Sequence, residues 1–350
     1  MSKTLFILKR REDYNAIMHS HIGLSTGLYN SANFMNDMLN AAGVESHIEV
    51  VVDNNDINRV VTDHRPTHVV IEALWVVPSK FTVLKEIHPT VTWIIRLHSE
   101  LPFLASEGMA MNWLGDYSTM PNVVIAANAP KMLREVSLYL KTKNGWTDAE
   151  TAKKVIYLPN YYPQEYTDYV TPKAKETIDI GCFGAVRPLK NHLSQAIAAI
   201  DFANQIGKKL NFHINAGRIE MQGQSVLNNL NALFAHLYDS GHRLINHDWT
   251  PRAEFLQLCA SMDLGLQVSF SETFNIVAAD LISQGVPVIG SKEIPWMSKA
   301  TCADPTNSED IVEALHLSYK YPELVVVANQ ALLTKYTNKT SKIWIAYFTA

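Results

Sequence analysis

Two carboxylates and a lysine of this chain are candidates for binding an anionic ligand. Glu272 and Asp280 are eight residues apart in the segment SFSETFNIVAADLISQGVPVIGS, residues 269–291. Eight residues make roughly two turns of α-helix, so both side chains can face one side. Lys190 stands just before a second predicted helix. Together these groups suit a ligand that carries phosphate and hydroxyl groups. The cation and the unpaired amides of a helix start bind phosphate, and the two acids bind hydroxyls.

The segment that carries the two acids is predicted to form a strand, a turn, a helix and a second strand. Residues 264–269 (LGLQVS) are a short apolar run with β character. We predict that Thr273 caps a helix that stops near Gly285, and that residues 286–290 (VPVIG) form the next buried strand. The helix then starts at the carboxyl end of a parallel strand, where an anion is favoured. The alternative is an ordinary α/β sheet in which both acids are merely solvated.

A second candidate for phosphate binding is the segment of residues 184–192 (GAVRPLKNH). It has a glycine after a predicted strand, then a proline, and then Lys190 before a helix, with Arg187 nearby. Fixed cations stabilise the charge that develops on a diphosphate leaving group more than they stabilise the ground state. Lysine and arginine in a loop are otherwise usually solvated, so the assignment depends on Glu272 and the helix start lying close by.

These two segments resemble the donor domain of retaining GT-B glycosyltransferases, the glycogen-synthase-like and family 4 group. In that family the first acid hydrogen-bonds hydroxyls of the donor sugar, the second acid binds the ribose of the nucleotide, and the lysine meets the donor diphosphate. The resemblance implies these roles for Glu272, Asp280 and Lys190, with Thr273 and Asn275 at the phosphate loop. The residues that match the first motif are Ser269, Glu272, Phe274, Asp280, Gly285 and Pro287.

Several positions depart from the family pattern. Asp280 stands where a glutamate is usual, which shortens the reach to the ribose. Thr273 and Asn275 stand where the family usually has glycines, so the phosphate loop is less open. The family arginine falls on Ala185, and we expect Arg187 to supply that charge from a different direction.

The resemblance also assigns two loops of the second half. Gly217 follows a predicted strand, residues 210–215, and family members place this loop beside the donor. Residues 246–255 (NHDWTPRAEF) match the loop that surrounds the nucleobase. Trp249 in that loop either stacks on the base or covers the sheet edge as a structural residue.

Two loops of the first half are further candidates for the site. Residues 21–31 (HIGLSTGLYNS) follow the first strand and contain Gly23 and Gly27, but the spacing is not that of a dinucleotide fingerprint. The loop resembles the Gly-rich donor loop of the same family; a plain flexible loop is the alternative. His98 directly follows a predicted strand, residues 91–97, and so lies at its carboxyl end. The family histidine at that place contacts the transferred sugar, and a hydrogen-bonded structural histidine is the alternative.

Strands and helices alternate along the whole chain, which predicts an α/β protein with two doubly wound, parallel, Rossmann-like sheets. The stretch of residues 164–177 is polar and lacks periodicity, so we place the boundary there. We expect an acceptor domain over residues 1–164 and a donor domain over residues 165–330. A helix over residues 331–350 is expected to cross back to the first domain. With the resemblance, this predicts the GT-B fold and a site in the cleft between the domains.

The composition of the chain argues against several other classes of protein. Hydrophobic residues make up 47% of the 350 and charged residues 18%, as in a soluble globular protein. A net charge of −4 gives no general attraction to nucleic acid or anionic lipid. The longest apolar run, residues 67–78, is too short to span a bilayer, and no signal-peptide layout is present. Cys182, Cys259 and Cys302 suit reduced thiols and a cytoplasm-like compartment.

Several catalytic motifs are missing from the sequence. It has no Asp-x-Asp, His-Glu-x-x-His, Cys-x-x-Cys or Walker A motif. We therefore expect a reaction that needs no metal and no dedicated cofactor. The expected function is transfer of a sugar, with retention, from a UDP- or GDP-sugar to a hydroxyl on a saccharide, a small metabolite or a hydroxymethylated pyrimidine in DNA. A nucleotide-sugar epimerase and a non-catalytic sugar-nucleotide-binding module are the alternatives.

Overall fold

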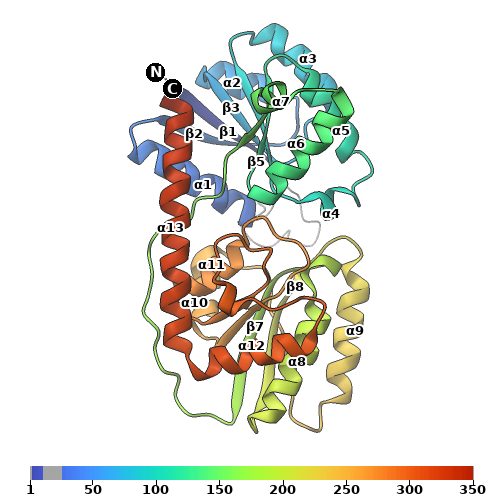
Figure 1. Ribbon diagram of the computed structural model, residues 1–350, viewed down its shortest axis with the longest axis vertical. Helices are drawn as coiled ribbons and strands as arrows, with labels where there is room; N and C mark the ends of the chain where they lie inside the picture. Colours follow the sequence, from blue (N-terminus) through green and yellow to red (C-terminus); the bar gives the residue numbers. More distant parts are fainter. Residues whose placement is uncertain (1, 11–25, 350) are drawn as a thin grey trace. The chain divides into compact units, whose positions relative to one another are not determined.

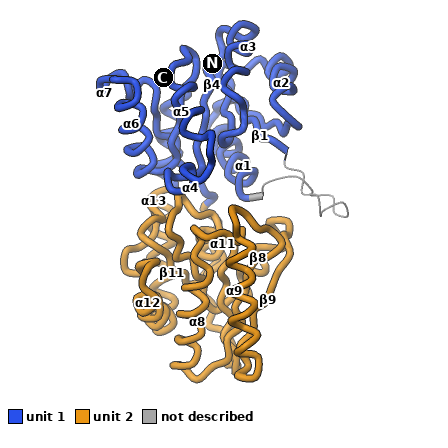
Figure 2. Tube along the Cα trace, turned by 90° about the vertical axis from the view of Figure 1, so that its right-hand side faces the viewer, with its two compact units in different colours: residues 1–163, 337–350 blue, residues 164–336 orange. Residues whose placement is uncertain are grey.

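The computed structural model describes residues 2–10 and 26–349 of the chain (Figure 1). The chain forms two compact units, coloured separately in Figure 2. Unit 1 consists of residues 1–163 and 337–350, and unit 2 of residues 164–336. The last helix, α13 (Pro322–Thr349), supplies its first part to unit 2 and its last part to unit 1.

Unit 1 is built on a six-stranded parallel sheet in the order β2-β1-β3-β4-β5-β6. Its strands are β1 (Lys3–Lys9), β2 (Glu45–Val51), β3 (His68–Glu72), β4 (Thr92–Leu97), β5 (Val123–Ala127) and β6 (Val155–Tyr157). Its other helices are α1 (Thr26–Ala41), α2 (Ile57–His64), α3 (Pro78–Ile87), α4 (Leu101–Leu104), α5 (Ala110–Thr119), α6 (Pro130–Asn144) and α7 (Asp148–Lys154). The central strands are continuous apolar runs because helices cover both faces of the sheet.

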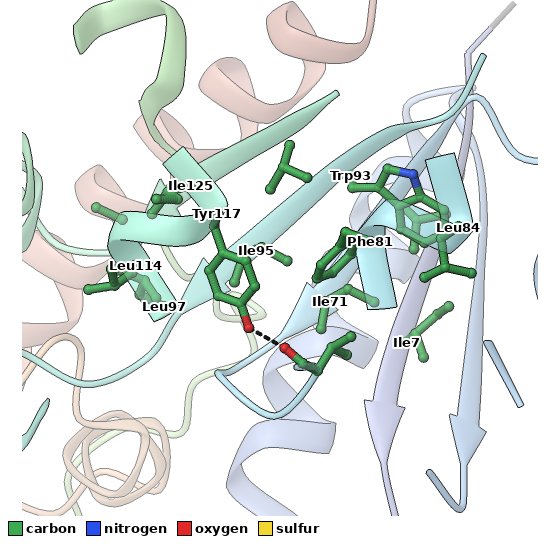
Figure 3. Close-up of a cluster of buried hydrophobic side chains, with 14 of the residues drawn as sticks. Ile7, Ile71, Phe81, Leu84, Trp93, Ile95, Leu97, Leu114, Tyr117 and Ile125 are labelled. Carbon is green, nitrogen blue, oxygen red and sulfur yellow. Dashed lines mark hydrogen bonds between the residues drawn. The ribbon is translucent and has the colours of Figure 1, made fainter. Parts of the chain in front are cut away.

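The two faces of this sheet have separate cores. On one face, α2, α3, α5 and α6 pack against the sheet, and the Phe81 ring makes edge-on contacts with Trp93 and with Tyr117 (Figure 3). The Tyr117 hydroxyl donates to the backbone oxygen of Val76, so this buried polar group is satisfied. On the other face, α1 and the end of α13 cover the sheet. Trp344 packs there and donates its indole N–H to the Pro159 oxygen at 2.8 Å.

Unit 2 is built on a five-stranded parallel sheet in the order β11-β10-β7-β8-β9. Its strands are β7 (Thr177–Val186), β8 (Lys209–Ile219), β9 (Arg243–Asn246), β10 (Leu264–Gln267) and β11 (Val288–Gly290). Its helices are α8 (His192–Gln205), α9 (Gly223–His236), α10 (Arg252–Ala260), α11 (Ile276–Ser283) and α12 (Ser308–Lys320), with two short 3-10 turns, η1 (Pro188–Lys190) and η2 (Lys299–Thr301). One core joins α8, α9 and α12 to the sheet.

The alternating α/β pattern predicted from the sequence is present in both units, with a few corrections. Helix α1 begins at Thr26 instead of near residue 31, so Gly27 lies in its first turn and not in a loop. Gly23 lies outside the described residues. Strand β8 runs on to Ile219, so Gly217 is part of the strand and does not follow it. Helix α7 was not predicted, although Thr147 and Glu150 form a capping box at its start.

Candidate functional site

Lys190 and Glu272 form an ion pair, with 2.5 Å between Nζ and Oε1. Lys190 ends η1, directly after β7, and Glu272 lies in the loop between β10 and α11. Their side chains are 11% and 7% exposed, so little water screens the pair and its attraction is stronger than that of a surface pair. The fold therefore brings together the predicted cation and the first predicted acid, which are 82 residues apart in the chain.

The prediction that Thr273 caps the next helix is wrong, because α11 starts at Ile276 with Asn275 as its cap. The Asn275 side-chain oxygen accepts a hydrogen bond from the Ala278 amide at 2.9 Å. Its backbone has φ +60°, a left-handed conformation that asparagine tolerates better than most residues and glycine best of all. This backbone conformation accounts for an asparagine at position 275.

The residues before this cap are buried. Thr273 and Phe274 are 8% and 2% exposed. The Phe274 ring packs against Trp296 and Tyr336, and the Trp296 indole donates to the Phe274 oxygen at 2.7 Å. Phe274 therefore anchors the loop through its apolar side chain, and Asn275, the next residue, caps α11.

Arg187 pairs with Glu220, a residue that the sequence analysis did not single out. The distance from Arg187 Nη1 to Glu220 Oε2 is 3.2 Å, and Arg218 reaches the other oxygen of the same carboxylate at 2.5 Å. The guanidinium of Arg218 in turn lies over the Trp249 ring, 5.3 Å from its centre. One carboxylate thus orients two arginines at the ends of β7 and β8.

Gly217 and Trp249 meet through their backbones. A Cβ added at Gly217 would lie 3.3 Å from the Trp249 nitrogen, closer than most real contacts, so the absence of a side chain lets the two segments approach. Trp249 is 38% exposed, and Arg218 covers part of its ring. A partly exposed indole beside an arginine is the kind of group that stacks on a planar ligand, and the contact of Trp249 with a nucleobase stays a prediction.

Asp280 pairs with Arg252, the first residue of α10. The carboxylate side chain is 5% exposed and the arginine side chain 23%. Asp280 lies in the middle of α11, a little over one turn after the capping residue Asn275. Sequence reasoning missed Arg252 because the pairing is tertiary; the only signal was its place in the predicted nucleobase loop, three residues after Trp249.

His98 belongs to a buried polar network in unit 1. Its Nε2 hydrogen-bonds Glu72, whose two oxygens each lie 3.1 Å from Arg96 Nη1. Burial opposes ionisation of Glu72, but the charges of Arg96 and His98 and their hydrogen bonds outweigh it and lower its pKa. Burial lowers the pKa of His98 in spite of the nearby carboxylate. The histidine is thus fixed by hydrogen bonds at the carboxyl ends of β3 and β4.

His192, the first residue of α8, is a buried histidine that sequence reasoning also missed. It is 1% exposed, and neither ring nitrogen has a hydrogen-bond partner among the described residues. Burial, together with the positive charges of Lys190 and Arg187, lowers its pKa to about 3. The ring is therefore neutral at physiological pH and sits directly beside the cations of the candidate site.

Within the described part of the chain, no group of three or more histidines, cysteines or acids is arranged to bind a metal ion. None of the helices over the described ranges is both long and apolar enough to cross a bilayer. The three cysteines are free thiols; Cys182 and Cys259 are buried and Cys302 is half-buried. Burial raises the pKa of Cys182 to about 12, so this thiol is protonated at neutral pH.

No protein-family model and no curated protein matches the chain. Solved structures match it over nearly its whole length. A UDP-forming trehalose-phosphate synthase from Burkholderia xenovorans superposes with a TM-score of 0.68 at 12% identity, covering 100% of this chain and 98% of that one. The N-terminal domain of trehalose-6-phosphate phosphatase from Candida albicans gives 0.72 at 11% identity, with 100% and 97% covered. HepE from Anabaena, in complex with UDP, gives 0.65 at 13% identity, with 99% of each chain covered.

The chain has the GT-B fold. Two parallel α/β units of six and five strands are the architecture predicted from the sequence, so the predicted fold class is confirmed. The similar structures include GT-B glycosyltransferases. At 11–13% identity, the likeness establishes the fold and leaves the roles of individual GT-B residues to the site geometry.

Proposed function

We propose that this chain is a glycosyltransferase that moves a sugar from a nucleotide sugar to a hydroxyl acceptor, with retention at the anomeric carbon. The observation that carries the proposal is the shielded pair of Lys190 and Glu272 beside the start of α11 in a GT-B fold. A UDP-linked donor is favoured over a GDP-linked one, because one similar structure is named UDP-forming and another contains UDP.

The donor would be bound by groups that unit 2 already brings together. An ammonium has three N–H donors, so Lys190 can keep Glu272 as a partner and still donate to the diphosphate. Glu272 would accept hydrogen bonds from hydroxyls of the sugar. The backbone from Thr273 to Asn275 would supply amides at the positive end of α11. Arg187, oriented by Glu220, would add a second charge near the phosphates.

The reaction would break the bond between the anomeric carbon and the diphosphate oxygen while a bond to the acceptor oxygen forms on the same face of the sugar. The proton of the acceptor hydroxyl would go to the departing phosphate oxygen, so no strong protein base is required. Negative charge grows on the leaving diphosphate, and Lys190 together with the start of α11 would stabilise that charge most in the transition state. His98 would contact the transferred sugar, in the orientation that Glu72 fixes.

The acceptor is proposed to be a saccharide or small metabolite, with a hydroxymethylated pyrimidine in duplex DNA as the other candidate. Incubation with UDP-, GDP- and ADP-sugars and each acceptor class, followed by nucleotide release and product mass, tests the reaction and the acceptor together. Transfer should proceed in EDTA, because no metal is proposed to take part. Binding to duplex DNA without a salt dependence would remove the DNA acceptor.

The result is interpreted with two pairs of variants. Glu272→Gln and Lys190→Met should each lower transfer by about 100-fold or more, whereas the exposed substitutions Glu313→Gln and Lys320→Met on α12 should leave it unchanged. Conversion of the donor sugar without an acceptor would point to an epimerase. Donor binding without any turnover would point to a binding module. Either outcome would overturn the proposal.

A further inference from the structure

We infer that Arg252 determines specificity for the nucleotide by donating hydrogen bonds to the ribose of the donor, and that Asp280 is a positioning residue that acts through it. This inference rests on the proposed function and alters the role that the sequence resemblance implied for Asp280. It starts from the ion pair between the two side chains, which joins the first residue of α10 to the middle of α11.

The two side chains of this pair differ in how much of each is exposed to solvent. The Asp280 side chain is 5% exposed, and the Arg252 side chain is 23% exposed. Asp280 also has one methylene fewer than the glutamate usual at this position of the resembling family, so its carboxylate lies closer to its own helix. Of the two side chains, that of Arg252 is therefore the more accessible to a ligand that approaches this pair from solvent.

The neighbourhood of Arg252 suits a nucleotide. Arg252 follows Trp249 by three residues, and the Trp249 backbone lies against Gly217 at the end of β8. Its partner Asp280 is five residues after Asn275, the cap at the start of α11. A ribose links a base to phosphates, so a ribose between the Trp249 loop and the start of α11 would pass the Arg252–Asp280 pair.

The chemistry of the two groups differs in direction. An ionised carboxylate only accepts hydrogen bonds, so a ribose hydroxyl bound to it must donate. A guanidinium has five N–H donors in a rigid plane. A guanidinium that is paired with a carboxylate can in general also donate to ribose hydroxyl oxygens. The shortened acid would thus convert a direct acceptor contact into a donor contact made by arginine, with the acid fixing the plane of the guanidinium.

The test measures dissociation constants of UDP and of 2′-deoxy-UDP by calorimetry for the full chain, four variants of the pair and one control variant. Arg252→Ala should weaken UDP binding by about 10-fold and bring the ratio of the two constants close to one, because the ribose contact is gone. Asp280→Asn should weaken UDP binding less. The double variant should bind no worse than Arg252→Ala alone, since both changes remove one coupled contact. Arg252→Lys should still distinguish UDP from 2′-deoxy-UDP, but by a smaller ratio of dissociation constants than the wild type.

Arg243→Ala is the matched control, since Arg243 also lies in unit 2, at the start of β9, and stacks on Tyr238. It should leave both constants unchanged. A further loss of about 10-fold when Asp280→Asn is added to Arg252→Ala would mean that the acid binds the ribose itself, and would overturn the inference. If Arg252→Ala lowers the stability of the chain but leaves the ratio of the two dissociation constants unchanged, the pair is only a structural ion pair, and the inference is also overturned. A wild-type chain that binds none of UDP, GDP and ADP would overturn the proposed function as well.

Discussion

The Nζ atom of Lys190 lies 2.5 Å from Oε1 of Glu272, and both side chains are shielded from most solvent. One comes from the 3-10 turn after β7 and the other from the loop before α11. Neighbouring parallel strands end at the same edge of a sheet, and β7 and β10 are paired neighbours. The topology of unit 2 therefore places a cation, a carboxylate and a helix start within reach of one ligand.

His192 should make the chain less stable in mild acid. Its ordinary pKa is 6.5 and its folded pKa is about 3, so between these values the unfolded chain binds the proton and the folded chain does not. Stability is therefore fully present above pH 6.5 and falls as the pH falls. From pH 7 to pH 5 this histidine should cost about 2 kcal/mol of unfolding free energy.

Urea unfolding at both pH values, for the wild type and for His192→Leu, measures this effect. All other titrating groups are common to the two chains, so the difference between their pH dependences isolates His192. The wild type should lose about 2 kcal/mol more than the variant. Equal losses would mean that the ring is hydrogen-bonded or hydrated in the folded chain.

Arg96→Met should destabilise unit 1 strongly. It would leave Glu72, fully buried with an exposure of 0%, without its main counter-charge, at a cost of about 3 to 5 kcal/mol. Adding Glu72→Gln should recover part of this loss, because the uncompensated charge is then removed. Arg59→Met is the matched control: its partner Asp63 lies 3.7 Å away and both side chains are more than 60% exposed, so the change should stay below about 0.5 kcal/mol.

Thermal or chemical unfolding of these variants measures the three free energies. Similar small losses for Arg96→Met and Arg59→Met would show that water reaches Glu72 and that the network is not buried as described. Failure of Glu72→Gln to recover any stability would show that lost packing, and not the stranded charge, causes the effect.

Asn275 combines a helix cap with a left-handed backbone. Asn275→Ala should cost about 2 kcal/mol, because it removes the cap and puts an unfavourable residue at φ +60°. Asn275→Gly should cost less than about 1 kcal/mol, because glycine loses the cap but adopts this backbone without strain. Urea unfolding of both variants gives the comparison. A glycine variant as unstable as the alanine variant would argue against the left-handed conformation.

The fold could be predicted from the sequence because alternating apolar strands and amphipathic helices are local patterns. The continuous apolar run of β1 is one example, and helix α8, whose buried face includes Ala196, Ala199 and Ala203, is another. The proximity of Lys190 to Glu272 could be predicted only through the resemblance, since no local signal joins residues 82 apart. The partners of the polar residues could not be predicted at all. Glu220 pairs with Arg187 because β7 and β8 lie side by side, and Arg252 pairs with Asp280 because α10 and α11 do. Neither neighbour relationship has a signal in the local sequence.

The start of α11 shows why the first residue of a helix could not be predicted from the local sequence. Thr273 and Asn275 are both good capping residues, and nothing in the local sequence chooses between them. The choice is made by tertiary packing, because Phe274 is fixed against Trp296 and the Asn275 amide donates to Gln267 at 3.0 Å. The prediction was therefore right about the helix and wrong about its first residue.

The central claim, that Lys190 meets the phosphates of a nucleotide donor, is tested most directly by the affinity of Lys190→Met for UDP. Calorimetry should show binding to the wild type and to the control Lys320→Met with equal dissociation constants, and binding to Lys190→Met weakened by about 10- to 100-fold. Unchanged UDP affinity in Lys190→Met would contradict the account.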